Sequence, residues 1–140
     1  MQRRDLPMSA MALAPEVPTL VLVPSDRAPA CARRFLAEQF RAMRLADDFV
    51  GRLVVTELVT NSCKHVGFGH IVVRIVVPDD VKDSVCVEVW DEGAGLPVVR
   101  PEDRDATGGR GLPLIIGLAQ EWGVRPLYET GKVVWARCAV

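Results

Sequence analysis

Residues 56–65 carry hydrophobic and polar side chains at helical spacing. At about 100° per residue, Asn61 falls about 40° and His65 about 80° from Glu57 on a helical wheel, so three polar side chains share one stripe. Apolar residues occupy the same arc: Val50, Val54 and Leu58. Burying a carboxylate and an amide among apolar side chains is costly unless they have partners. The pattern therefore predicts either a buried hydrogen-bond network or a pocket whose ligand pairs with these groups.

The sequence around this stripe marks the ends of the helix. Asp47 or Asp48 precedes it and can cap its first turn, because aspartate oxygens accept from the free N–H groups there. Two glycines in residues 66–69 are typical of the chain leaving a helix. Upstream, an apolar run at residues 19–23 predicts a strand, and residues 28–43 predict another helix. The arginines of that helix are explained by a solvated face or by an anion site: Arg33, Arg34, Arg41 and Arg44.

Downstream of residue 69 the pattern changes from helical to alternating. Residues 70–77 are rich in β-branched side chains, and residues 84–90 should pair with them as a hairpin. In the second of these strands Val85, Val87 and Val89 share one face. Asp91 has the same parity, so we expect its carboxylate to point toward the core. There the protein or a ligand must pair with it.

Two glycine clusters flank a polar segment later in the chain. Residues 100–107 lack an apolar period, and glycines lie on both sides of them, which is typical of a mobile lid with hinges. A helix is expected over residues 112–121, then strands at 123–128 and 133–138. The order of elements, β-α-α-β-β-lid-α-β-β, predicts an α+β fold. We expect a two-layer α/β sandwich with helices on one face of a mainly antiparallel mixed sheet.

Composition narrows the class of protein. A chain of 140 residues, about half of them hydrophobic, suffices for one domain, which we place at residues 18–140 after a flexible tail at 1–17. A net charge of −1 gives no electrostatic footprint for nucleic acid, and no apolar run is long enough to span a membrane. The cysteines are widely spaced: Cys31, Cys63, Cys86 and Cys138. This spacing argues against a zinc site and favours a reducing cytoplasm.

The second glycine cluster suits phosphate binding. Gly109, Arg110 and Gly111 precede the expected helix at Leu112, so backbone N–H groups and the helix dipole would face an anion. On its own, this feature is a weak signal, because glycine before a helix is often only a turn. Lys132 follows a glycine but lacks the hydroxyl residue and upstream glycine of a P-loop.

Three motifs occur together and in a fixed order. They are E-x-x-x-N-x-x-x-H at Glu57, Asn61 and His65, D-x-G-x-G at Asp91, Gly93 and Gly95, and G-x-G-L at Gly109, Gly111 and Leu112. This combination resembles the ATP-binding fold shared by gyrase, a heat-shock chaperone, sensor histidine kinases and MutL, known as the GHKL or Bergerat fold. The compact size is most similar to the anti-sigma factor and serine-protein kinase branch (RsbW and SpoIIAB type). The resemblance covers about residues 19–138.

The resemblance implies ATP and Mg²⁺ as cofactors and assigns a role to each motif. Asn61 would coordinate Mg²⁺ through its amide oxygen, and Glu57 would act as general base. Asp91 would accept from the adenine amino group. The remaining motif residues would approach the purine or hold the β- and γ-phosphates and close the lid: Gly93 and Gly95 for the purine, and Gly109, Arg110, Gly111 and Leu112 for the phosphates.

Other interpretations of these residues remain open. Glu57 is also explained by a salt bridge, and Asn61 by a structural amide. His65 suits a helix end as well as a phosphate or metal contact. Ser62 replaces the small apolar residue usual after the asparagine, which is a mild change. Val133 stands where many relatives carry a threonine near the adenine, so we expect one polar contact to the base to be missing.

The function implied by the resemblance is a cytoplasmic serine/threonine-protein kinase and anti-sigma factor. It would phosphorylate an antagonist protein of the STAS type and then hold a sigma factor inactive, with no direct nucleic-acid or membrane partner. A homodimer is expected from the family. Two alternatives are a non-catalytic, nucleotide-sensing partner-switching module and a detached histidine-kinase catalytic domain. The second is disfavoured because we find no phosphoacceptor segment.

Overall fold

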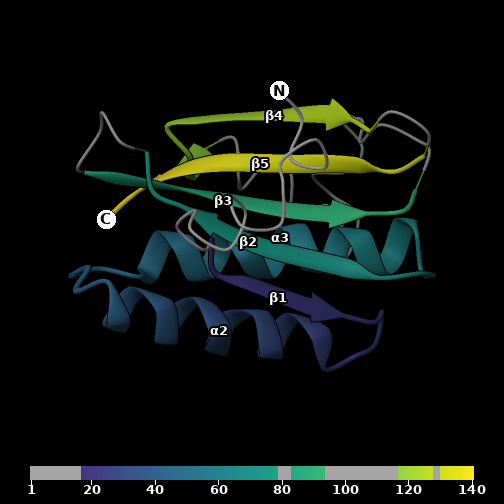
Figure 1. Ribbon diagram of the computed structural model, residues 1–140, viewed down its shortest axis with the longest axis horizontal. Coiled ribbons are helices and arrows are strands. Elements are labelled where there is room, and N and C mark those ends of the chain that lie inside the picture. The colour runs from purple at the N-terminus through teal and green to yellow at the C-terminus, as the bar shows by residue number, and fades with distance from the viewer. Residues whose placement is uncertain (1–16, 79–82, 94–116, 128–129) are drawn as a thin grey trace, which may run out of the picture.

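The computed structural model describes residues 17–78, 83–93, 117–127 and 130–140. Within these ranges, seven elements follow in order: β1 (Thr19–Leu22), α2 (Ala28–Ala42), α3 (Phe49–His65), β2 (Ile71–Val76), β3 (Ser84–Asp91), β4 (Glu121–Pro126) and β5 (Lys132–Ala139). The strands form one sheet in the order β1-β2-β3-β5-β4, and each of these pairings is antiparallel. Both helices lie against the same face of the sheet (Figure 1). The predicted two-layer α+β fold is confirmed.

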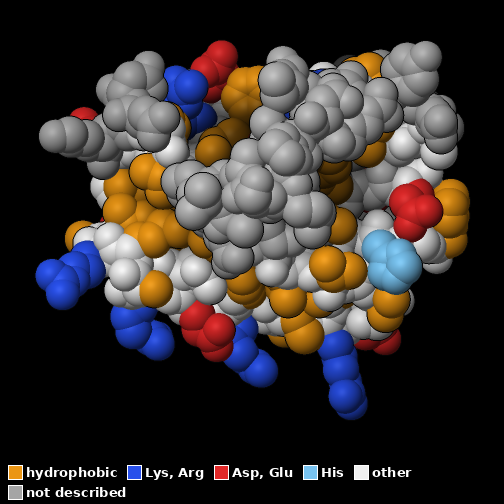
Figure 2. Space-filling view, in the orientation of Figure 1, with side chains coloured by type: hydrophobic (Ala, Val, Ile, Leu, Met, Phe, Trp, Pro, Cys, Tyr) orange, Lys and Arg blue, Asp and Glu red, His pale blue; other side chains and the backbone are white. Residues whose placement is uncertain are grey.

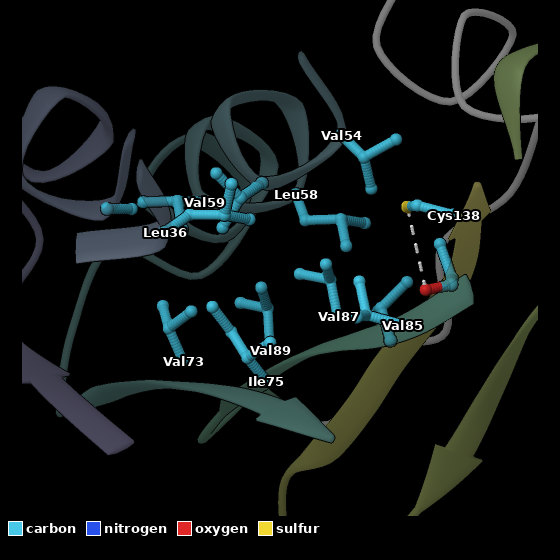
Figure 3. Close-up of a cluster of buried hydrophobic side chains, with 14 of the residues drawn as sticks. Leu36, Val54, Leu58, Val59, Val73, Ile75, Val85, Val87, Val89 and Cys138 are labelled. Carbon is cyan, nitrogen blue, oxygen red and sulfur yellow. Dashed lines mark hydrogen bonds between the residues drawn. The ribbon is translucent and has the colours of Figure 1, made fainter. Parts of the chain in front are cut away.

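The hydrophobic core lies between the helices and the sheet. Alternation in β2 and β3 turns every second side chain toward the helices, so Val73, Ile75 and Val87 are at most 1% exposed. From the helical side, Leu36 of α2 and Val59 of α3 complete the packing (Figure 3). These apolar side chains stabilise the two layers by roughly 1.5–3 kcal/mol each.

The two helices approach closely where α3 begins. A Cβ at Gly51 would lie 3.2 Å from Leu36 Cδ2 and 3.2 Å from Phe40 Cζ, so only a residue without a side chain fits here comfortably. Asp48 is the N-cap residue, but Asp47 supplies the capping oxygen, since its Oδ1 accepts from Phe49 N at 2.9 Å. One of the two aspartates predicted to cap this helix therefore does so.

The far end of α3 matches the predicted helix stop. The N–H groups of Val66 and Gly67 both donate to the carbonyl of Ser62, at 3.0 and 3.1 Å. Gly67 has φ of 74°, a conformation that glycine adopts without steric cost. This turn redirects the chain into β2.

Not all predicted boundaries hold. The helix expected over residues 112–121 does not reach its predicted end, because Glu121 opens strand β4, two residues before the strand predicted at 123–128. The reason is the pairing with β5: Trp122 and Val124 alternate onto the core, while the Glu121 carboxylate lies 3.5 Å from Arg137. Residues 117–118 are helical. The lid segment at 100–107, and the tail up to residue 16, lie outside the described residues.

No helix in the described part of the chain has the length and apolar character needed to cross a membrane.

Candidate functional site

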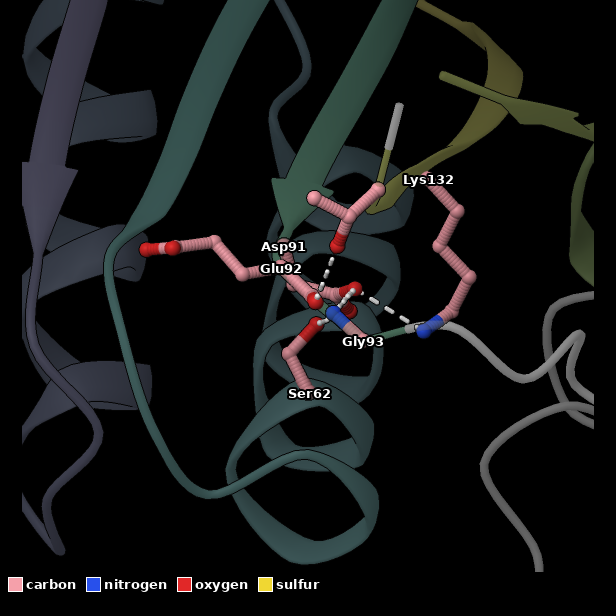
Figure 4. A network of polar contacts seen from close by, with 6 residues as sticks. Ser62, Asp91, Glu92, Gly93 and Lys132 are labelled. Carbon is pink, nitrogen blue, oxygen red and sulfur yellow. Dashed lines mark hydrogen bonds and ion pairs between the residues drawn. The ribbon is translucent and has the colours of Figure 1, made fainter. Parts of the chain in front are cut away.

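The carboxylate of Asp91, at the end of β3, accepts three hydrogen bonds inside the protein. Its Oδ1 accepts from Lys132 Nζ at 2.8 Å and from the backbone N–H of Gly93 at 3.1 Å, while Oδ2 accepts from Ser62 Oγ at 2.7 Å. Figure 4 shows the donors converging from α3, β5 and the residues after β3. Asp91 is only 4% exposed, so the inward orientation predicted from strand parity is confirmed.

Local structure explains why these donors meet. Ser62 lies one helical turn beyond Leu58, on the buried face of α3 that packs against the sheet. Lys132 begins β5 directly opposite Asp91 in the strand pairing. Gly131 has φ of 96°, and a Cβ there would lie 2.5 Å from the carbonyl oxygen of Asp91. Glycine at this position therefore permits the close approach that places Lys132 beside the carboxylate.

The Asp91–Lys132 ion pair is almost fully withdrawn from water, with side-chain exposures of 2% and 9%. Desolvation of two charges is compensated only when their geometry is good and their remaining hydrogen-bonding capacity is used. Here the carboxylate also accepts from Ser62 and Gly93, so both of its oxygens are engaged. Removing one member of such a pair typically costs about 3–5 kcal/mol, because the other charge stays buried alone.

The polar stripe of α3 is more exposed than the cluster around Asp91. Glu57 and Asn61 are partly exposed, and His65 is exposed. Val54 and Leu58 of the same arc are at most 2% exposed, so the stripe borders the buried face of α3. This excludes a fully buried network of the three polar groups, while the pocket stays a prediction. Within the described ranges, no cation lies within ion-pair distance of Glu57. Those ranges thus offer no support for the salt-bridge interpretation.

Strand parity corrects the prediction for Val133. Val133 pairs with Trp90, and Lys132 pairs with Asp91, so Val133 and Asp91 point to opposite faces of the sheet. The residue of β5 beside the carboxylate is therefore Lys132, which supplies a polar group where we expected a contact to be missing. From the sequence, we named Lys132 only when excluding a P-loop.

A family model described as the histidine kinase-like ATPase domain matches residues 24–138. The chain belongs to this family. No curated protein matches the chain significantly. Membership supports the GHKL part of the resemblance and implies that the ATPase domain binds ATP.

The residues around Asp91 can be compared with what recognition of an adenine would need. Asp91 offers a buried carboxylate acceptor at a strand end, and Gly93 lies two residues after it. A Cβ at Gly93 would lie 2.4 Å from Val66 Cγ2 and 3.1 Å from Lys132 Nζ. These residues have the right chemistry for the amino group of a base. The Lys132 ammonium, however, already bonds one of the two acceptor oxygens.

Other predicted residues of the ATPase domain lie outside the described ranges: Gly95, Gly109, Arg110, Gly111 and Leu112. A search of the described residues finds no group of three or more His, Cys, Asp or Glu side chains that could hold a metal ion. Mg²⁺ in ATP sites is commonly held by one or two protein ligands together with phosphate oxygens and water. Asn61 suits the role of such a single ligand.

Two cysteines of the sheet are poor nucleophiles at neutral pH. Burial raises the pKa of the Cys86 thiol to about 11, with a further rise from the nearby Glu88 carboxylate. Burial also raises the pKa of Cys138 to about 12. Both thiols therefore stay protonated at neutral pH, and a protonated thiol is a poor nucleophile.

Proposed function

We propose that this ATPase domain is a serine/threonine-protein kinase and anti-sigma factor of the RsbW and SpoIIAB type. The observation that supports this proposal most is that helix α3 carries both a residue bonded to Asp91 and the candidate general base and metal ligand. Ser62 on the buried face of α3 bonds Asp91, and Glu57 and Asn61 lie partly exposed on the same helix. One helix thus links the base acceptor to the candidate general base and metal ligand.

Each of these side chains has a separate task in the proposed kinase. Bound Mg·ATP supplies the phosphoryl group that is transferred. Asp91 accepts a hydrogen bond from the base amino group, and the amide oxygen of Asn61 is a hard-cation ligand. The Glu57 carboxylate is partly exposed and would be accessible to a hydroxyl of a protein partner. It would take the hydroxyl proton as the new P–O bond forms and the bond from the γ-phosphorus to ADP breaks, with ADP leaving.

The proposed partners are a STAS-type antagonist, which would be phosphorylated, and a sigma factor. Helix α2 and the residues just after it offer a basic surface for an acidic partner, since Arg34 and Arg41 of the helix and Arg44 beyond its end are exposed. Arg33 is different, because its Nη1 donates to Thr56 Oγ1 of α3 at 3.3 Å. The exposed arginines are therefore the docking candidates, while Arg33 joins the two helices. A homodimer also remains a proposal.

The test is transfer of labelled phosphate from Mg·ATP to the antagonist by wild type and Glu57→Ala. Loss of the general base should lower the transfer rate by about 10²–10⁴-fold, while calorimetry should show ATP binding within a few-fold of wild type. Glu38→Ala removes an exposed carboxylate of α2 and serves as the matched control. An unchanged transfer rate in Glu57→Ala would exclude this carboxylate as the base and refute the proposed mechanism.

One observation favours a second candidate, a non-catalytic partner-switching module. Because Lys132 already bonds Asp91, the base acceptor is held by the protein itself. In such a module the nucleotide would only alter the partner-binding surface. Partner binding that depends on ATP, together with no phosphate transfer by the wild type, would select this candidate. Transfer to a histidine rather than a serine or threonine would instead indicate a histidine-kinase catalytic domain.

A further inference from the structure

The Lys132 side chain lies beside Gly93 of the D-x-G-x-G motif. Its ammonium group bonds Asp91 Oδ1 at 2.8 Å and sits 3.1 Å from the point that a Cβ of Gly93 would occupy. Figure 4 shows the side chain reaching from the start of β5 across to this carboxylate. The Lys132 ammonium group therefore bonds one of the two carboxylate oxygens of Asp91 and takes up part of the space beside Gly93.

A base and this ammonium compete for the same acceptor. Oδ1 already accepts from Lys132 and from Gly93 N, and Oδ2 from Ser62. A carboxylate has about four lone-pair sites, two on each oxygen, so Oδ1 has none left for a base amino group and Oδ2 has one. Both bonds have an ionised acceptor, but the ammonium also carries a full positive charge, so the carboxylate attracts it more strongly than it attracts a neutral amino group. Binding of a base at Asp91 is therefore opposed by an internal contact.

We propose that Lys132 is an affinity-setting residue of the nucleotide site that acts as an intramolecular competitor of the base. The side chain must release Asp91 Oδ1 before an adenine amino group can take its place. This inference rests on the proposed nucleotide site at Asp91. Its consequence is that the apparent affinity for ATP is reduced by the fraction of molecules in which Lys132 holds the carboxylate.

Substitution of Lys132 tests the competition directly. Lys132→Thr removes the cation from Asp91 Oδ1, and threonine is a favourable residue in a strand. Calorimetric titration with Mg·ATP should show binding about tenfold tighter, or more, than wild type. Lys132→Arg keeps a cation and should remain close to wild type. Lys64→Ala removes one positive charge from an exposed position of α3 and controls for net charge.

The outcomes separate this inference from the proposed function. Equal or weaker ATP binding by Lys132→Thr, with measurable binding by wild type, would overturn the competitor role and leave the ATP site in place. Absence of binding to both proteins at millimolar Mg·ATP would refute the nucleotide site and, with it, the inference.

A second measurement uses the wild-type chain and does not depend on how the variants fold. The sequence contains three lysines, so acetylation of each can be followed by mass spectrometry of peptides. Lys132 is buried in its ion pair and should acetylate much more slowly than exposed Lys64. Saturating Mg·ATP should accelerate labelling of Lys132 at least severalfold relative to Lys64. An unchanged or slower rate would mean that the base does not displace Lys132, and would overturn the inference.

Discussion

Replacing Ser62 by alanine tests whether helix α3 stabilises the Asp91 carboxylate. The Ser62 hydroxyl is 4% exposed and donates to Asp91 Oδ2 at 2.7 Å. A hydrogen bond to a charged group contributes about 1.5–3 kcal/mol. Alanine is favoured over serine in a helix by roughly 0.5 kcal/mol, which offsets part of the loss. The free energy of unfolding of Ser62→Ala should therefore fall by about 1–2.5 kcal/mol.

The chain offers a matched control for this substitution at Ser84. Ser84 is 1% exposed, but its hydroxyl has no hydrogen-bond partner among the described residues. Ser84→Ala removes the same atom without breaking a bond, so the free energy of unfolding should change by less than about 0.5 kcal/mol or rise.

Urea unfolding followed by tryptophan fluorescence measures both variants against wild type. The three tryptophans of the chain report on the transition. A loss of stability in Ser62→Ala no larger than in Ser84→Ala would show that the Ser62 bond has no net value. The idea that α3 holds the base acceptor in place would then be refuted.

Two further predictions concern the sheet. Gly123→Ala would place a Cβ 2.7 Å from Trp135 Cζ2, so the indole must shift. The free energy of unfolding should fall by about 1–3 kcal/mol, and the tryptophan fluorescence spectrum should change. An unfolding transition identical to that of wild type would contradict this prediction. For Cys86, whose burial raises the thiol pKa from 9.0 to about 11, the unfolded chain loses its proton first as pH rises. This thiol's contribution to stability is therefore complete below pH 9 and lost between about pH 9 and 11. Plots of the free energy of unfolding against pH should differ in slope between wild type and Cys86→Ala only in that window. A difference in slope below pH 8 would refute the raised thiol pKa as the cause. At pH 8, a thiol reagent should modify exposed Cys31 well before Cys86.

The sequence predicted best those features that depend on local periodicity. Alternation through Val85, Val87 and Val89 was enough to predict that Asp91 points inward, and it is 4% exposed. The end of α3 followed from the glycines after it, since a positive φ at Gly67 ends the helix. In both cases neighbours in sequence determine the geometry.

Features that depend on pairing between distant strands were missed. The Lys132–Asp91 contact joins residues 41 positions apart, and it depends on the register between β3 and β5. A shift of that register by one residue would present Val133 instead, which is what we expected from the sequence. Ser62 did give a signal, as a polar residue at the position that continues the buried face from Leu58. We interpreted it only as a mild departure from the family pattern.

Strand order has a consequence for how the protein forms during synthesis. β5 is the last described strand to leave the ribosome, yet it lies between β3 and β4 in the sheet. Until residues 132–139 emerge, the hydrogen-bonding edge of β3 is unpaired, and β4 has no neighbour. Unpaired strand edges of this kind promote association with other chains. The nascent chain therefore depends on residues 132–139 both to close the sheet and to neutralise the charge on Asp91.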